Sequence, residues 1–236
     1  MGVYAENTAE AYQFTRDAQD EFSITSLKRA LLAAENGYFS DEIVPITVQS
    51  RKAETVIKND EQPRNARPEK IPELRPAFRE HGTVTAANSS SISDGAAALI
   101  LVRRSEAEKQ GLTPLAAIHG HATHAQDPEW FTTAPIEAIN KVLAKASWNK
   151  DEVDLFEINE AFAVVTMAAM KDLGLSHDKV NVHGGACALG HPVGATGARI
   201  IVTLLHALSR YDLKKGVASL CIGGGEATAI AIERLN

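Results

Sequence analysis

The stretch GGACALGHPVGATG, residues 184–197, decides the architecture of this chain. Small residues surround a single histidine, His191, between a strand-like run at 180–182 and a helical run at 194–208. Glycine permits positive φ and close approach of backbones, so a tight turn between strand and helix is expected. A histidine in such a turn can donate or accept a proton near neutral pH. The stretch is equally compatible with a packed turn whose histidine is only structural.

Strand-like and helical runs alternate on both sides of this turn. β-Branched and apolar residues concentrate in short runs, and apolar residues at helical spacing lie between them. The alternation predicts a mixed sheet covered by helices, an α/β fold. The strands are expected at 115–123, 153–158, 180–182, 217–222 and 227–232, and the helices at 135–146, 161–173 and 194–208.

The first hundred residues have a different composition. Apolar residues at three- to five-residue spacing predict a helix from Thr15 to about residue 36. Five of the nine prolines follow between Pro45 and Pro76, which predicts extended or loop structure. A strand is expected at 82–85, and a buried helix or strand at 96–102.

Two further segments carry reactive side chains. Cys221 precedes three glycines, Gly223 to Gly225, at the end of a predicted strand. Its thiolate can act as a nucleophile or base, although free cysteine is often only a small buried apolar residue. Asn159 stands at a strand-to-helix junction, where an amide can orient a water or an oxyanion, or can simply cap the helix.

Together these segments resemble the C-terminal motifs of the thiolases. The matching stretches are Asn159-Glu160-Ala161-Phe162, Gly190-His191-Pro192 and Cys221-Ile222-Gly223-Gly224-Gly225, in the family's order. Earlier stretches agree, including Leu74-Arg75-Pro76-Ala77-Phe78 and Gly82-Thr83-Val84-Thr85-Ala86, so the resemblance covers essentially the whole chain. It implies a thiolase-like fold in which a mainly helical and irregular loop domain accompanies the sheet domain.

The resemblance also implies roles for single residues. His191 would activate a nucleophilic cysteine and contribute to an oxyanion hole, and Asn159 would hold the water that completes this hole. Cys221 would be the acid/base for the α-proton, and Gly223 would offer an N–H to a second oxyanion hole. The residues expected to bind coenzyme A are Arg64, Leu74, Phe78, Ala86 and Ser90.

The chain departs from the family pattern in more than one place. Thiolases form their acyl-enzyme on a cysteine of the N-terminal half, and neither Cys187 nor Cys221 matches it. The chain is therefore expected to lack that half: residues 1–91 would be an incomplete loop domain, 92–112 the last strand and helix of the absent N-terminal domain, and 113–236 a complete C-terminal domain. The segment at 131–135 also departs from several biosynthetic members, which leaves the preferred acyl length open.

The resemblance implies acyl transfer between CoA thioesters, either Claisen condensation of two acetyl-CoA or thiolysis of a 3-ketoacyl-CoA. The isolated chain is expected to be inactive. The alternatives are one subunit of a two-chain thiolase, a non-catalytic CoA-binding remnant, and a fragment of an ordinary thiolase. Ketosynthases are less similar because they typically place a second histidine where this chain has Cys221. The expected partners are acyl-CoA and CoA, with either a homo-oligomer or a separate N-terminal half.

The bulk composition excludes several classes of function. The net charge of −6 argues against a nucleic-acid binder, which normally has a basic face. No apolar run reaches the roughly 18 to 20 residues that span a membrane, and no signal peptide is evident, so a cytoplasmic location is expected. No cofactor is expected beyond the CoA substrates. His119, His121 and His124 suggest a metal site only weakly, because no fourth ligand is clear, so none is expected.

Overall fold

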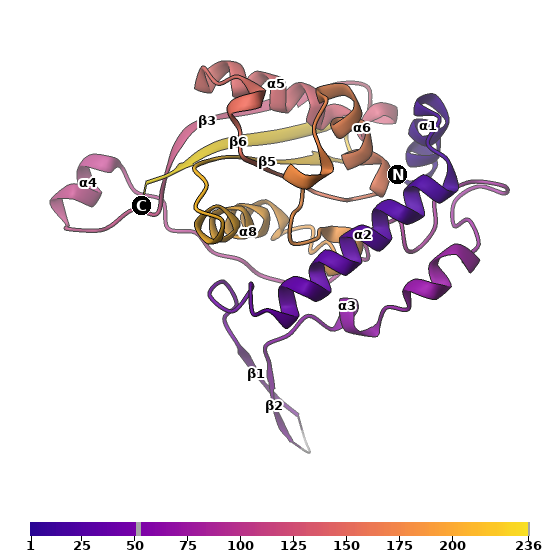
Figure 1. Ribbon diagram of the computed structural model, residues 1–236, viewed down its shortest axis with the longest axis horizontal. Coiled ribbons are helices and arrows are strands. Elements are labelled where there is room, and N and C mark those ends of the chain that lie inside the picture. Colours follow the sequence, from indigo (N-terminus) through magenta and orange to yellow (C-terminus); the bar gives the residue numbers. More distant parts are fainter. Residues whose placement is uncertain (51–52, 236) are drawn as a thin grey trace.

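A four-stranded mixed sheet forms the centre of the computed structural model, which describes residues 1–50 and 53–235 (Figure 1). Its order is β3-β6-β5-β4, with β4 parallel to β5 and both other pairs antiparallel. The predicted α/β class is confirmed. The strands are β3 (Ala116–Ala125), β4 (Leu155–Ile158), β5 (Lys215–Ile222) and β6 (Glu226–Arg234).

Helices cover both faces of this sheet. Helices α5 (Ala134–Ala146) and α6 (Ala163–Leu173) lie on one face and α8 (Thr196–Arg210) on the other, as Figure 1 shows. Neighbouring residues of a strand point to opposite faces, so Val217 packs in the cluster under α5 and α6, whereas Ala218 packs under α8. Apolar side chains on both faces bury the sheet, which explains why its strands are almost continuously apolar.

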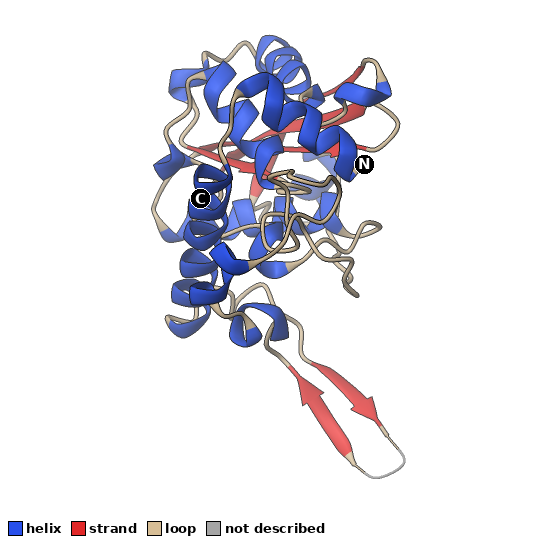
Figure 2. Cartoon of the chain, turned by 90° about the vertical axis from the view of Figure 1, so that its right-hand side faces the viewer, coloured by secondary structure: helices blue, strands red, loops and turns tan. Residues whose placement is uncertain are grey.

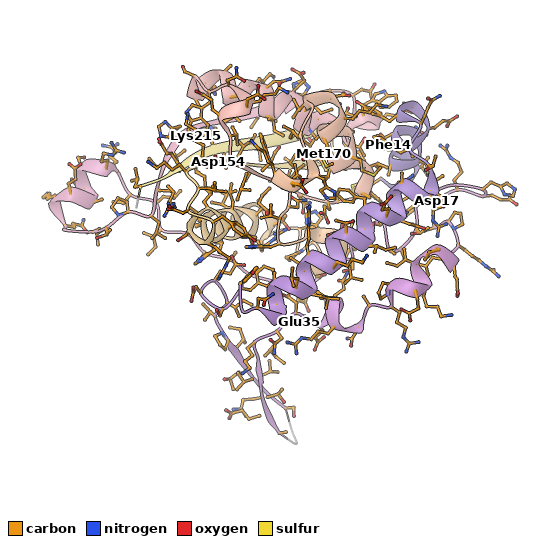
Figure 3. All side chains as sticks on the ribbon, in the orientation of Figure 1. Phe14, Asp17, Glu35, Asp154, Met170 and Lys215 are labelled. Carbon is orange, nitrogen blue, oxygen red and sulfur yellow. The ribbon has the colours of Figure 1, made fainter. Side chains whose placement is uncertain are left out.

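At the amino end of the parallel pair β4 and β5, a carboxylate accepts two backbone hydrogen bonds. Asp154 and Lys215 are labelled in Figure 3, where they lie side by side. Asp154 Oδ2 accepts the N–H groups of Lys214 at 2.9 Å and Lys215 at 2.8 Å. Because β4 and β5 run in the same direction, their carboxyl ends meet at the opposite edge, where ligands usually bind in such sheets.

The N-terminal part is helical, as predicted. It contains α1 (Gly2–Tyr12) and α2 (Arg16–Glu35), and Thr15 caps α2 by accepting the N–H of Ala18 at 3.1 Å. The proline-rich zone holds more regular structure than predicted: a projecting antiparallel hairpin of β1 (Ile46–Gln49) and β2 (Glu54–Ile57), then α3 (Glu61–Asn65) and the 3-10 helix η1 (Pro68–Glu73) (Figure 2).

The remaining helices are short. They are α4 (Arg104–Lys109), α7 (Ala186–Leu189) and the 3-10 helices η2 (Pro128–Trp130), η3 (Lys150–Glu152) and η4 (His177–Lys179). The strand predicted at 180–182 is reduced to one isolated bridge, between Val180 and Phe156.

The strand predicted at 82–85 does not form. The carboxylate of Glu6, which is 3% exposed, accepts the N–H of Thr83 at 2.9 Å and that of Val84 at 3.0 Å. Asn88 Oδ1 accepts the N–H of Thr85 at 2.7 Å. Side chains thus satisfy the backbone donors that a strand would offer to a neighbour.

The buried helix or strand predicted at 96–102 is also wrong. Residues 93–103 have neither helix nor strand in the structure, and α4 begins only at Arg104. Ile100 is 94% exposed and Leu101 is 74% exposed. The apolar run finds no neighbouring strand or helix face in the described chain that would bury it.

Candidate active site

Asn159 follows the last residue of β4 and is 1% exposed. Its N–H donates to the carbonyl of Ser219 on β5 at 2.9 Å, which continues the parallel ladder by one residue. Its side-chain Nδ2 lies 3.5 Å from Nε2 of His191. Its Oδ1 is buried and has no hydrogen-bond partner within the described part of the chain. A buried carbonyl oxygen that is unpaired is a place where a water or a ligand donor is expected.

His191 lies in the turn between α7 and α8. Its N–H donates to the carbonyl of Ser91 at 2.9 Å, and it forms an isolated parallel bridge with Ile92, so a second segment holds its backbone. Ring Nδ1 is 2.6 Å from Oγ1 of Thr196. Burial lowers the pKa of the imidazole, and the positive charge of Arg199 lowers this pKa further. The ring is therefore neutral at physiological pH and can accept a proton.

Cys221 is the next-to-last residue of β5 and is 6% exposed. Burial raises the pKa of its thiol to about 12, so the thiol keeps its proton at neutral pH. Its apolar surroundings include Phe131, Phe162 and Val84. A protonated thiol at this position can give a proton to a carbanion, and it becomes a base only when a bound group stabilises the thiolate.

Gly223 lies in the turn between β5 and β6, below the side chain of Met1. A Cβ built at Gly223 would be 2.7 Å from Met1 Sδ, so a larger residue could enter only if the flexible thioether moved. The flexible side chain of Met1 therefore covers Gly223 on this side of the turn.

The structure brings three of the predicted site residues to one edge of the sheet. His191 and Asn159 are in contact, and the carboxyl ends of β4 and β5 place Asn159 and Cys221 at the same edge. Phe162, three residues after Asn159, packs against Cys221 and pairs with Ser89. Among the described residues, no hydrogen bond joins His191 to Cys221.

Two of the five residues predicted to bind CoA line a cavity of about 310 Å³. They are Leu74 and Ala86, which share this cavity with Arg67 and Lys70. The walls are largely apolar and come from α2, α3, η1 and α7.

The other three residues predicted to bind CoA lie outside the lining of this cavity. Arg64 is exposed on α3, next to the lining residue Asn65. Phe78 packs edge-to-face on Phe162, with ring centroids 5.9 Å apart. Ser90 donates through Oγ to the carbonyl of Ala161 at 3.0 Å, two residues after Asn159.

The second cysteine has different surroundings. Cys187 is 9% exposed, and its backbone N–H donates to Glu160 Oε2 at 3.1 Å, while its Sγ lies 3.7 Å from the carbonyl of Glu160. Burial raises the pKa of this thiol well above its usual value. The charge of Glu160 acts in the same direction as burial, against a hydrogen bond with Ser23 that lowers the pKa, so the Cys187 thiol keeps its proton.

Two of the three histidines of β3 have side-chain partners other than a metal. His119 pairs with Glu233 at 2.7 Å, and His124 contacts Lys141 and Gln126. A bulge between Ile118 and Gly120 interrupts the regular alternation of side chains. In the part of the chain that the structure describes, no group of three or more metal-ligating side chains is close enough to hold an ion.

Sequence reasoning missed three neighbours of the site. Thr196 contacts the ring of His191, Met1 covers Gly223, and Phe131 packs against Cys221. Thr196 had a local signal, since a hydroxyl five residues after a turn histidine can reach its ring. Met1 is far from Gly223 in the sequence, and only the tertiary structure brings them together.

Comparison with known proteins identifies the family of this chain. The protein family described as "Thiolase, C-terminal domain" matches residues 112–234, and the family described as "Thiolase, N-terminal domain" matches residues 1–105. The chain belongs to the thiolase family.

Individual relatives agree with this assignment. A protein of Dictyostelium discoideum described as a probable acetyl-CoA acetyltransferase is 50% identical over 236 residues, which are 100% of this chain and 57% of that protein. The crystal structure of Bacillus anthracis acetyl-CoA acetyltransferase superposes with a TM-score of 0.97 at 49% identity, covering 100% of this chain and 60% of that one. Acat5 thiolase from Ascaris suum, solved in complex with coenzyme A, gives a TM-score of 0.89 at 41% identity, with the same shares covered.

These matches correct one expectation. The prediction that the chain lacks the thiolase N-terminal domain was wrong, because the family description of that domain matches residues 1–105. The predicted inactivity and the predicted separate N-terminal partner chain both depended on that absence, and neither is supported. The chain spans about 60% of the length of the relatives it matches.

Proposed function

We propose that this chain takes part in acyl transfer between CoA thioesters, either condensing two acetyl-CoA or cleaving a 3-ketoacyl-CoA with CoA. The observation that carries the proposal is the contact between Asn159 Nδ2 and the neutral ring of His191, at the edge where Cys221 also lies. Proton transfer next to a thioester needs a base, a protonated thiol and an unpaired amide oxygen.

In this proposal His191 accepts the proton of the thiol that takes up the acyl group, and Asn159 orients a water that donates to the thioester oxygen. Cys221 exchanges the α-proton of the second acyl-CoA: it donates this proton during thiolysis and removes it during condensation. The backbone N–H of Gly223 donates to the enolate oxygen, which lowers the pKa of the α-carbon and brings it closer to that of the thiol.

Thiolysis of acetoacetyl-CoA, followed as CoA-dependent loss of the 3-ketoacyl thioester, tests the proposal. His191→Asn and Cys221→Ser are each expected to lower kcat by about 10²- to 10⁴-fold, the usual contribution of a general acid or base. His121→Asn, the same change at an exposed histidine of β3, is the matched control and should keep the rate. Equal turnover in His191→Asn and the unchanged protein would contradict the proposed role.

The cavity lined by Leu74 and Ala86 is the proposed site for part of CoA. Its apolar walls suit the pantetheine arm or the adenine, and Arg67 and Lys70 offer charges to the phosphates. Calorimetric titration should show tighter binding of CoA than of phosphate-free pantetheine. Lys70→Ala should reduce that difference, whereas Lys109→Ala on α4 should preserve it. Equal affinities for CoA and pantetheine would argue against binding of the CoA phosphates by Arg67 and Lys70.

A CoA-binding module without turnover is the second candidate. It is favoured by one observation: burial raises the pKa of both thiols in the chain. CoA binding with no detectable thiolysis in the unchanged protein would support this candidate over the catalytic one.

Self-association and a cytoplasmic location remain proposals. The exposed apolar residues Ile92, Ile100 and Leu101 support self-association, and sedimentation analysis over a range of protein concentrations tests it. Two unpaired thiols support a reducing compartment. No helix in the described part of the chain is long and apolar enough to cross a membrane.

A further inference from the structure

We infer that Thr196 sets the tautomer of His191, so that Nδ1 carries the ring proton and Nε2 is unprotonated and presents its lone pair to the site. Thr196 Oγ1 lies 2.6 Å from Nδ1 of His191 and 3.0 Å from the carbonyl oxygen of Pro192. A hydroxyl has one proton to donate, so these two contacts cannot both receive it. Which of them does so decides the tautomer.

The contact with Pro192 indicates in which direction the Thr196 hydroxyl donates its proton. A carbonyl oxygen only accepts, so the Thr196 hydroxyl must donate its proton there if the 3.0 Å contact is a hydrogen bond. The lone pairs of Thr196 Oγ1 are then left for the ring, and Nδ1 of His191 must be the donor. The carbonyl of Pro192 also accepts the N–H groups of Ala195 at 2.8 Å and Thr196 at 3.0 Å, which holds it in place.

The contact on the Nε2 side of the His191 ring indicates the same tautomer. Nε2 of His191 faces Nδ2 of Asn159, which can only donate. A proton on Nε2 would put two donors opposite each other, whereas a lone pair accepts. The hydrogen bonds therefore run in one direction, from Asn159 through His191 and Thr196 to the carbonyl of Pro192, with a donor and an acceptor at every step.

Thr196 is well placed to hold this arrangement. It is the first residue of α8 and is 0% exposed, and both its N–H and its hydroxyl are tied to Pro192. Threonine has few side-chain rotamers, so its oxygen is fixed relative to the ring. Thr196 does not touch the reacting atoms in the proposed mechanism and is a positioning residue.

The consequence for chemistry depends on the proposed function. When a thiol gives its proton to Nε2, the S–H bond breaks, a thiolate and an imidazolium form, and Nδ1–H keeps its acceptor on Thr196. With the opposite tautomer, Nε2 would already hold a proton and could not accept another. Proton transfer thus requires no rotation of the ring.

Nitrogen-15 NMR of histidine-labelled protein tests the inference without any turnover. The chain has 8 histidines, and the spectrum of His191→Asn identifies the signals of His191. We expect long-range proton–nitrogen correlations typical of Nδ1–H in the unchanged protein and in Thr196→Ser, which keeps the hydroxyl. In Thr196→Val we expect a mixture of tautomers or the Nε2–H form, with the pKa of His191 lowered further because the imidazolium loses an acceptor. Thr203→Val, the same change at a buried position of the same helix, should leave His191 unaltered.

The Nε2–H form in the unchanged protein would overturn the inference, even if Thr196→Val failed to fold. So would an unaltered tautomer in a folded Thr196→Val. Where thiolysis is measurable, kcat should fall about 10²-fold in Thr196→Val and recover in Thr196→Ser, with KM unchanged. A chain with no turnover but the Nδ1–H form would refute the proposed function and leave the tautomer inference standing.

Discussion

At the scale of single residues, the most unusual group outside the site is the carboxyl of Glu157. It is 2% exposed on β4, and its nearest cation is Arg199 Nη1, at 3.8 Å from Oε2. Burial raises the pKa of Glu157 to about 8, and the charges of Glu160 and Glu42 act in the same direction against Arg199. Burial likewise raises the pKa of Glu42 to about 7. At neutral pH the carboxyl of Glu157 is therefore largely protonated in the folded chain, and that of Glu42 is about half protonated.

Glu157 predicts a pH dependence of stability. Between its ordinary pKa of 4.5 and its folded pKa of about 8, the folded state binds more protons than the unfolded state, so stability falls as pH rises. The slope from one such group is at most about 1.4 kcal/mol per pH unit. Glu157→Gln should flatten this fall, whereas Glu137→Gln, at an exposed position on α5, should not. Urea unfolding at several pH values between 5.5 and 8.5 measures the effect, and a fall as steep in Glu157→Gln as in the unchanged protein would contradict it.

At the scale of elements, the close approach of α2 to the turn at Gly184 holds the histidine turn against the N-terminal part. Gly184 has φ +79°, and a Cβ there would lie 2.5 Å from the carbonyl oxygen of Ser26 and 2.9 Å from the backbone nitrogen of Ala30. Both neighbours belong to the backbone of α2 and cannot yield without moving the helix.

Gly184→Ala is therefore expected to lower the free energy of unfolding by roughly 2–4 kcal/mol, since left-handed strain and overpacking each cost about 1–3 kcal/mol. Gly194→Ala is the control, because nothing lies within 4 Å of its Cβ position. Denaturant titration of both variants gives the comparison. Equal stability would show that the helix and the turn separate easily.

Hydrogen bonds to side chains also decided whether a predicted strand forms. The segment at 82–85 has the composition of a strand, yet Glu6 and Asn88 take up its N–H groups. The carboxylate of Glu6 comes from α1, more than seventy residues earlier, so no local pattern could have shown this competition.

At the scale of the whole molecule, residues 93–103 form a largely exposed segment without helix or strand, near the end of the region that matches the thiolase N-terminal domain. Limited trypsin digestion is expected to cut after Arg103 before it cuts at Arg16 or Arg29, since α2 is packed and segments without secondary structure open most easily. Mass spectrometry of the first fragments identifies the cut. Early cleavage within α2 would contradict the packing described above.

The sequence by itself determined the α/β class, the helices α2, α5, α6 and α8, and the three motifs of the site. These follow from short-range patterns, because apolar periodicity and glycine-rich turns act over a few residues. His191, Asn159 and Cys221 could be selected because their segments keep a recognisable order.

Only the tertiary structure decided how those residues are held. The contact between Thr196 and His191, the position of Met1 over Gly223 and the loss of the strand at 82–85 depend on which segments meet in space. Protonation is likewise a tertiary property, since burial changes the pKa of His191 and Cys221 in opposite directions by disfavouring the charged form of each. The sequence motifs indicate which groups are candidates for proton transfer, and the packing around these groups determines which of them carry a proton.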